Sequence, residues 1–290
     1  MLIYTTFVSP FIEFEFMRRA LVGALALALG AGPVGVVLML RLMSLMGDAM
    51  AHAILPGAAI GFLLAGLNLF ALTVGGLAAG LLVALLAGFV ARTTELKEDA
   101  ALAAFFLVSL AVGVTIVSLR GSNIDLLHFL FGSVLALDDQ TLVLIAGIAT
   151  LSLVVMSLIW RPLVLDCVDP GFLRTVSRAG APVHILFLAL VVLNLVGGFH
   201  ALGTLLAVGM MMLPAVASRF WSRDITSMIF MSIGIGILSG YAGLLLSFHT
   251  AVPAGPAIIL VAGAIYVGSV VFGRFGGIAR QFFPGRHLEA

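Results

Sequence analysis

An aspartate and a histidine four residues apart, Asp48 and His52, stand out in the stretch SLMGDAMAHAILPG at residues 44–57. On a helix, side chains at positions i and i+4 share one face, and Ser44 falls on that face one turn earlier. One carboxylate oxygen with one imidazole nitrogen suits a first-row divalent ion such as Zn²⁺ or Mn²⁺ better than Ca²⁺ or Cu(I). Two ligands do not complete a metal site, so the pair predicts either a dimer or transient passage of the ion.

Two explanations without a metal compete for these residues. Asp48 is also a good N-cap for a helix that starts at a membrane surface, and a lone histidine is more often a satisfied core residue than a ligand. The surroundings favour a functional pair, because residues 49–91 contain no Asp, Glu, Lys or Arg. An ionisable group at bilayer depth costs about 2.5–3.5 kcal/mol on insertion scales.

Four further residues are weaker candidates for contact with a passing ion. His128 follows Asp125 by three residues, which predicts a relay or gate at the outer face, while His200 and His249 fall at the ends of apolar runs as candidate entrance ligands. For each histidine the ordinary surface explanation is favoured. Asn194, within an apolar run, is expected to hydrogen-bond to a neighbouring helix.

The composition places the chain in lipid. Of its 290 residues 62% are hydrophobic and 9% are charged, and the mean hydropathy is +1.27, whereas soluble domains contain about 25% charged residues. The single cysteine, Cys167, excludes a disulfide within the chain and a cysteine-built metal site. The first residues, MLIYTTFVSPFIEFEF, lack the basic region of a cleavable signal. The sequence contains no phosphate-binding G-x-x-x-x-G-K-[ST], no H-E-x-x-H and no G-x-S-x-G.

Apolar runs predict an all-α, polytopic membrane protein, since a helix needs about 20 apolar residues to cross a bilayer. The stretch from Asp48 to about Leu67 predicts a short span broken at Pro56-Gly57, and residues 183–217 predict two short spans joined at His200. The total is nine spans, or eight if one short piece is re-entrant. The other charge-poor runs are residues 21–40, 69–91, 100–119, 141–160, 225–248 and 251–273.

Basic residues predict the orientation of these spans. With nine spans and an outer N-terminus, eleven of the 14 Lys and Arg residues fall in inner loops, which places the C-terminus in the cytoplasm. Residues 1–17 then form an outer-face interfacial segment, 18–273 the transmembrane domain and 274–290 a basic cytoplasmic tail. The inner residues are Arg41, Arg92, Lys97, Arg161, Arg174, Arg178, Arg219, Arg223, Arg274, Arg280 and Arg286, against Arg18, Arg19 and Arg120 outside.

Two connections between spans have their own predicted structure. The outer one, residues 121–140, is too apolar for an ordinary loop and predicts a short helix at the outer mouth. In the longest inner one, Asp169 with Pro170 favours a helix start, Arg174 and Arg178 lie one turn apart, and Gly180 ends the helix. A short basic helix at about 169–180 is a docking surface for a soluble partner.

The motif SLMGDAMAHAILPG resembles the signature of the membrane subunits of bacterial zinc and manganese ABC importers, the ABC-3 permease family. Further stretches similar to the family follow in order along the chain, so that the resemblance covers almost all of residues 18–273. They are LKEDAALAAFF (96–106), DLLHFLFGSVLAL (125–137), GTLLAVGMMMLPAVASR (203–219) and VPAGPAIILVAGA (252–264).

The resemblance implies the type II ABC importer fold, related to the vitamin B12 importers, in a bacterial cytoplasmic membrane. It implies a homodimeric pore, two copies of a cytoplasmic ATP-binding subunit, a periplasmic or lipid-anchored metal-binding protein, and no permanently bound cofactor or nucleic acid. The family's aspartate and histidine fall on Asp48 and His52, which would contact the transported Zn²⁺ or Mn²⁺. Residues 169–180 are similar to the helix that couples to the ATPase. This sequence has Ala51 where serine is common.

Three other functions remain open on the sequence. An iron importer would share the same features. A passive metal channel would work without an ATPase. An intramembrane metalloenzyme would use Asp48 and His52 as ligands, although it lacks a recognisable third ligand and general base.

Overall fold

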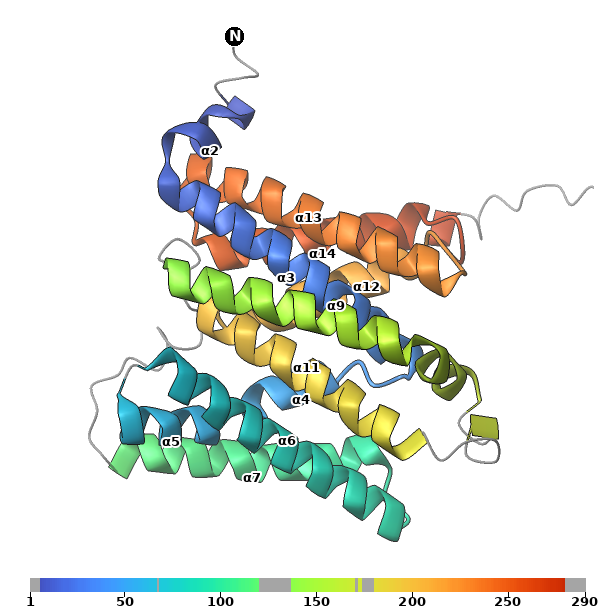
Figure 1. The fold of residues 1–290 in the computed structure, drawn as a ribbon. Coiled ribbons are helices and arrows are strands. Elements are labelled where there is room, and N and C mark those ends of the chain that lie inside the picture. The colour runs from blue at the N-terminus through green and yellow to red at the C-terminus, as the bar shows by residue number, and fades with distance from the viewer. Residues whose placement is uncertain (1–5, 67, 120–136, 170–171, 174–179, 280–290) are drawn as a thin grey trace, which may run out of the picture.

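The computed structural model describes residues 6–66, 68–119, 137–169, 172–173 and 180–279. Within these ranges the chain forms helices and no strands, and most of the helices lie side by side in one bundle (Figure 1). The helices are α2 (Ser9–Glu13), α3 (Glu15–Leu40), α4 (Met46–Ala53), α5 (Leu55–Ala65), α6 (Leu69–Thr93), α7 (Glu98–Leu119), α9 (Asp139–Val168), α11 (Gly180–Leu202), α12 (Thr204–Arg219), α13 (Ile225–Thr250) and α14 (Ala254–Phe272).

The helix lengths agree with the predicted number of spans. In the described part of the chain, eight segments are long and apolar enough to cross a membrane, with α4 and α5 together counted as one segment of 20 residues. The ninth, α12, is apolar but has 16 residues, which corresponds to about 24 Å of helix. Large apolar side chains point outward, such as Leu158 at 77% and Phe230 at 70% exposure. These side chains need lipid around them.

Local sequence explains where several helices begin. The side chains of Asn68, Asp138 and Asp224 accept backbone hydrogen bonds at the N-termini of α6, α9 and α13. The predicted joint between the two short spans at His200 is displaced. His200 lies in the last turn of α11, and Gly203, with φ of 84°, separates α11 from α12, because glycine adopts this backbone conformation without steric cost.

The helices α3 and α11 form the interior of the bundle. The most apolar windows of α3 and α11 are 78% and 67% buried, against 28% for both α9 and α14. Asn194 of α11 is buried and donates to Ser152 Oγ of α9 at 2.7 Å and to the Leu190 carbonyl at 2.8 Å. The predicted interhelical hydrogen bond of Asn194 is confirmed.

The described part of the predicted N-terminal interfacial segment packs against α13. Phe14 separates α2 from α3, which begins at Glu15, earlier than the run at residue 21 suggested. Tyr241 of α13 donates to the Phe7 carbonyl at 2.8 Å, and its ring stacks on Phe11 at 5.2 Å. The segment is therefore tied to the bundle by a hydrogen bond and by aromatic contact.

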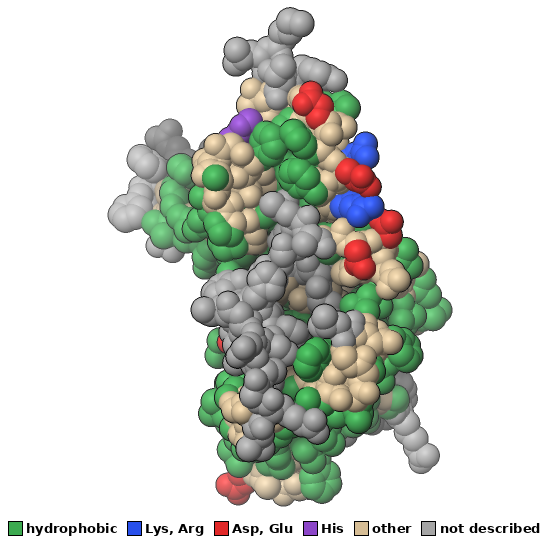
Figure 2. Space-filling model, turned by 90° about the vertical axis from the view of Figure 1, so that its left-hand side faces the viewer, with side chains coloured by type: hydrophobic (Ala, Val, Ile, Leu, Met, Phe, Trp, Pro, Cys, Tyr) green, Lys and Arg blue, Asp and Glu red, His purple; other side chains and the backbone are tan. Residues whose placement is uncertain are grey.

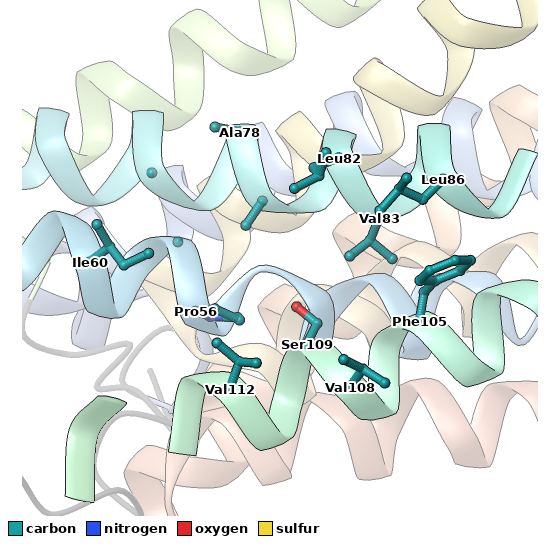
Figure 3. Close-up of a pocket in the computed structure, with 13 residues that line it drawn as sticks. Pro56, Ile60, Ala78, Leu82, Val83, Leu86, Phe105, Val108, Ser109 and Val112 are labelled. Carbon is teal, nitrogen blue, oxygen red and sulfur yellow. The ribbon is translucent and has the colours of Figure 1, made fainter. Parts of the chain in front are cut away.

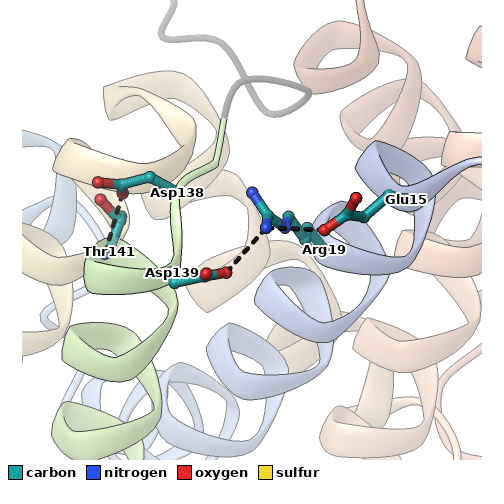
Figure 4. Close-up of polar contacts among 5 residues, drawn as sticks. All are labelled: Glu15, Arg19, Asp138, Asp139 and Thr141. Atoms are coloured by element: carbon teal, nitrogen blue, oxygen red, sulfur yellow. Dashed lines mark hydrogen bonds and ion pairs between the residues drawn. The ribbon is translucent and has the colours of Figure 1, made fainter.

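Charged side chains gather along one edge of the end of the bundle that carries the N-terminus of α3 (Figure 2). Arg19 of α3 lies between Glu15 at 2.8 Å and Asp139 of α9 at 3.1 Å, which joins the N-terminal turns of the two helices (Figure 4). Next to it, hydrogen bonds from the side chain and backbone of Thr141 lower the pKa of Asp138 below its ordinary value of 3.8.

Candidate functional site

The helix that carries Asp48 and His52 lies within the bundle. After α3 ends, residues 41–45 form a turn, and in Figure 1 the chain returns from the right-hand end of α3 toward the middle of the bundle before α4 begins. The helix α4 packs against α6, α7, α11 and α12. Met46, Met50 and Ala53 of α4 are each at most 2% exposed. Most of the surface of α4 therefore belongs to the core.

Asp48 and His52 form the polar face of this helix. Asp48 Oδ1 lies 3.9 Å from His52 Nε2, and the two side chains are 68% and 31% exposed. This confirms that the spacing of four places them on one face. Asp48 lies in the first turn of the helix and His52 in the last turn.

The alternative explanation of Asp48 as an N-cap is wrong. The N-cap position is Leu45, and no side-chain hydrogen bond caps the helix. The carboxylate of Asp48 therefore does not cap α4. It is the more exposed of the two polar side chains on this helix.

His52 has an unusual environment for a core histidine. Its Nδ1 atom is buried and has no hydrogen-bond partner in the described structure. Its ring lies 6.3 Å from the ring of Phe106 on α7, with 29° between the two planes. The explanation as a satisfied core histidine therefore fails for Nδ1, and Nε2 is the nitrogen that faces Asp48. Phe106 could not be selected from the sequence, because it is one of 21 phenylalanines.

A joint separates α4 from α5. Pro56, in the first turn of α5, has no backbone N–H to continue the hydrogen bonds of α4. Ser109 of α7 donates to the Ala53 carbonyl at 3.0 Å. Pro56 and Ser109 also line an apolar cavity of about 470 Å³ between α5, α6 and α7 (Figure 3). The break predicted at Pro56-Gly57 lies two residues earlier, at Ile54, and the adjacent Ala53 carbonyl is bonded to a neighbouring helix.

The first turn of α4 rests on α12. A Cβ atom at Gly47 would lie 2.9 Å from Met211 Cε and 3.7 Å from Met212 Sδ. Met211 is fully buried. Ala51, where serine is common in the family that the sequence resembles, is 4% exposed, so this position lies in the core.

Of the weaker candidate ligands, only His249 has a described side-chain contact, and that contact lies away from this site. Asp125 and His128 lie outside the described residues, as does the predicted outer helix. His200 lies in the last turn of α11. His249 Nε2 lies 3.1 Å from the Thr6 carbonyl, so this histidine contacts the N-terminal segment. Among the described residues, no group of three or more His, Cys, Asp or Glu side chains could hold a metal ion.

The predicted coupling helix is described only in part, and one of its boundaries differs. Asp169 Oδ1 accepts a hydrogen bond from the Phe172 backbone at 2.9 Å, and Phe172 and Leu173 are helical, which agrees with a helix start at Asp169. Arg174 and Arg178 lie outside the described residues. Gly180 is the first residue of α11 instead of the end of the preceding helix, because Pro182 fits the first turn of a new helix.

Comparison with known proteins identifies the family. The model of the ABC 3 transport family matches residues 13–273. The chain belongs to the ABC 3 transport family. It is therefore a membrane permease of an ABC transporter, as its GDAMAH motif predicted, and a multi-pass membrane protein.

Individual relatives are named for the transport of different ions. The manganese import system permease protein ScaB of Streptococcus parasanguinis is 34% identical over 263 residues, which cover 91% of this chain and 92% of ScaB. A protein of Haemophilus influenzae named "Probable iron transport system membrane protein" is 29% identical over 263 residues, 91% of this chain and 96% of the relative. The solved structure of PsaBC from Streptococcus pneumoniae in complex with Fab matches with a TM-score of 0.84 and 29% identity over 97% of this chain and 100% of that chain. The all-α ABC permease fold is confirmed.

Proposed function

We propose that this ABC 3 permease is the membrane subunit of an ATP-driven importer of divalent transition-metal ions, manganese or zinc. Two copies of the chain form the translocation path. Asp48 and His52 of each copy contact the ion during its passage. Outward-open and inward-open packings of the dimer alternate, so that the ion never meets a continuous pore.

The observation that carries this proposal is the exposure of Asp48 on a helix whose other faces are buried. A carboxylate that is 68% exposed in a single chain is costly wherever it faces hydrocarbon. A second copy, or a water-filled path between two copies, removes that contact with lipid. Two copies would bring two carboxylates and two imidazoles toward one path, which provides the ligands that a single chain lacks.

The environment of His52 supports passage of the ion instead of storage. A histidine that holds a resident metal usually donates its second ring N–H to a carboxylate or carbonyl, which orients the ring and strengthens the ligand. His52 Nδ1 has no such partner in the described structure. A ligand without this support binds weakly, and weak binding favours release on the far side of the membrane.

The proposed partners follow from the family and the charge pattern. A cytoplasmic ATP-binding subunit, in two copies, docks on the segment that includes Asp169, Arg174, Arg178 and Gly180. A periplasmic or lipid-anchored metal-binding protein delivers the ion to the opposite face. The eleven inner basic residues favour a bacterial cytoplasmic membrane with the N-terminus outside and the C-terminus in the cytoplasm.

Manganese is the favoured ion, because ScaB is named a manganese import permease and a carboxylate is a hard ligand that suits Mn²⁺. Iron is the second candidate, since the Haemophilus influenzae relative carries an iron name. Uptake of Mn²⁺, Zn²⁺ and Fe²⁺ in separate assays distinguishes the three. A passive channel would transport without the ATPase, and a metalloenzyme would turn over a substrate with the permease alone.

The test is metal uptake by proteoliposomes that contain the permease and its ATP-binding subunit, with the metal-binding protein added outside. Asp48→Asn keeps the shape of the side chain and removes its charge, and His52→Ala removes the nitrogen ligand. Each should lower Mn²⁺ uptake at least about tenfold, while membrane insertion and binding of the ATPase stay unchanged. Asp99→Asn, the same chemical change on an exposed aspartate of α7, should transport normally.

Wild-type uptake in Asp48→Asn would refute the assignment of Asp48 as a contact of the ion. Equal uptake with a catalytically inactive ATPase would instead refute the ATP-driven mechanism and favour a channel.

A further inference from the structure

Arg41 is a buried cation at the end of α3. Its side chain is 6% exposed, although the sequence pattern assigned it to an inner loop. Its Nη2 atom lies 2.5 Å from Asp166 Oδ2, and its Nη1 atom lies 3.0 Å from His184 Nδ1. The guanidinium also lies over the ring of Phe187, with Cζ 4.6 Å from the ring centroid. Three elements therefore meet at this one side chain.

The partners of Arg41 flank the segment that is proposed to dock on the ATPase. Asp166 lies in the last turn of α9, and His184 and Phe187 lie in the first two turns of α11. The proposed docking segment, 169–180, connects these two helix ends. Any force that the ATPase applies to this segment consequently reaches α9 and α11 next to Arg41.

Arg41 is also the first residue of the connection that leads from α3 to the candidate site. The turn of residues 41–45 leads directly into α4. The turn has a defined shape: Leu42 has a φ of 59°, and the Met43 backbone donates to the Leu38 carbonyl at 3.0 Å and the Met46 backbone to the Met43 carbonyl at 3.0 Å. A displacement of Arg41 is thus transmitted along a short, structured connection to the turn of α4 that contains Asp48.

The far end of α4 provides the pivot. The joint at Ile54 separates α4 from α5, and α5 is packed tightly on α6 through Gly57 and Gly75, whose backbones approach each other closely. The helix α4 is therefore attached to a fixed element at one end and to the Arg41 turn at the other. Movement of the Arg41 end would tilt α4 about this joint.

We propose that Arg41 is a positioning residue that couples the docking segment to α4, so that movement of the ends of α9 and α11 shifts Asp48 and His52. Arg41 does not touch the ion. The proposal rests on the proposed function. Arg41, the turn of residues 41–45 and α4 form a contiguous set of contacts between the docking segment and the pair of Asp48 and His52. The side chain has to be arginine, because its planar fork donates to Asp166 and to His184 at the same time, and a lysine ammonium does not reproduce this geometry.

The chemistry of the His184 contact fixes one protonation state. A guanidinium has only donors, so His184 Nδ1 has to accept and carries no proton. Arg41 thus contacts the Asp166 carboxylate through Nη2 and the His184 ring through Nη1. Loss of either contact would allow α9 or α11 to move without moving the turn of residues 41–45.

The test compares Arg41→Lys, Arg41→Met and Asp166→Asn in the same proteoliposomes, with Mn²⁺ uptake and ATP hydrolysis measured together. We expect ATP hydrolysis to stay within about twofold of wild type and the number of ions transported per ATP to fall at least about tenfold in all three variants. Matched changes of Arg161, an exposed arginine of α9, to Lys and Met should leave that ratio unchanged. A purely structural role would lower uptake and hydrolysis in parallel through loss of assembled transporter.

The outcomes separate this proposal from the proposed function. Wild-type ions per ATP in Arg41→Lys and Asp166→Asn would overturn the role of Arg41, even where Asp48→Asn is inactive and the proposed function stands. Uncoupled hydrolysis in the Arg41 variants with normal transport in Asp48→Asn would keep the coupling role and remove Asp48 from the path. If Arg41→Met does not assemble, the two milder variants decide, and a parallel loss of uptake and hydrolysis in both counts against the proposal.

Discussion

The contact between α5 and α6 allows a quantitative test of how the half of the bundle next to the candidate site is held together. A Cβ atom placed on Gly57 would lie 1.9 Å from the Gly75 carbonyl oxygen, and one placed on Gly75 would lie 2.2 Å from the Gly57 carbonyl oxygen. Ordinary contact begins at 3.4 Å, so Gly57→Ala would require the two backbones to separate by about 1.5 Å. A backbone oxygen cannot rotate away as a flexible side chain can.

The expected size of the effect follows from two opposing terms. Alanine stabilises a helix interior by about 1 kcal/mol relative to glycine, whereas overpacking typically costs about 1–3 kcal/mol and sometimes more. Because the clash at Gly57 is with backbone, we expect a net destabilisation of about 2 kcal/mol or more. Gly147→Ala on α9 is the matched control, since its Cβ would meet nothing within 4 Å, and it should be neutral or stabilising by up to about 1 kcal/mol.

Thermal unfolding of the purified permease in detergent measures this difference. Cys167 is the single cysteine and is partly buried, so a thiol-reactive dye reports its exposure on unfolding. The two variants differ by about 2–3 kcal/mol, and a chain of this size shifts by about 2–4 °C per kcal/mol, so Gly57→Ala should melt about 4–12 °C below Gly147→Ala. Equal melting temperatures for the two variants would refute the inferred backbone contact, and the fixed pivot of α4 would be lost with it.

Two further predictions concern polar groups. Asn194→Leu removes the buried hydrogen bond to Ser152, and we expect it to lower the free energy of unfolding by about 1–2 kcal/mol in the same dye assay; unchanged stability would contradict this. Asp138, the N-cap of α9, has a pKa lowered by Thr141, so its stabilising contribution is complete above pH 3.8 and is lost as the pH falls through the lowered pKa. Amide exchange at Thr141 should therefore accelerate below that pH and match Asp138→Ala, which should accelerate it at neutral pH as well.

The positions of the spans and the identity of the candidate pair could be predicted from the sequence. Runs of about 20 apolar residues identify spans because the thickness of the bilayer sets the helix length, and Asp48 and His52 share a face because four residues make about one turn. Asn194 was likewise predictable as an interhelical donor, because an amide inside an apolar helix needs a partner. All of these inferences depend on neighbours in the sequence or on the solvent.

The tertiary structure decided what lies at a distance along the chain. Arg41 looks like any other basic residue of an inner loop, because its partners Asp166 and His184 are 125 and 143 residues away. His249, a weak candidate for an entrance ligand, lies beside the Thr6 carbonyl, which is 243 residues away in the chain. The exposure of Asp48 and the orphaned Nδ1 of His52 likewise depend on which helices surround α4. Local periodicity and hydropathy are set by residues within a few turns of one another. Burial, long-range ion pairs and buried polar atoms without a hydrogen-bond partner arise only when separate helices pack together.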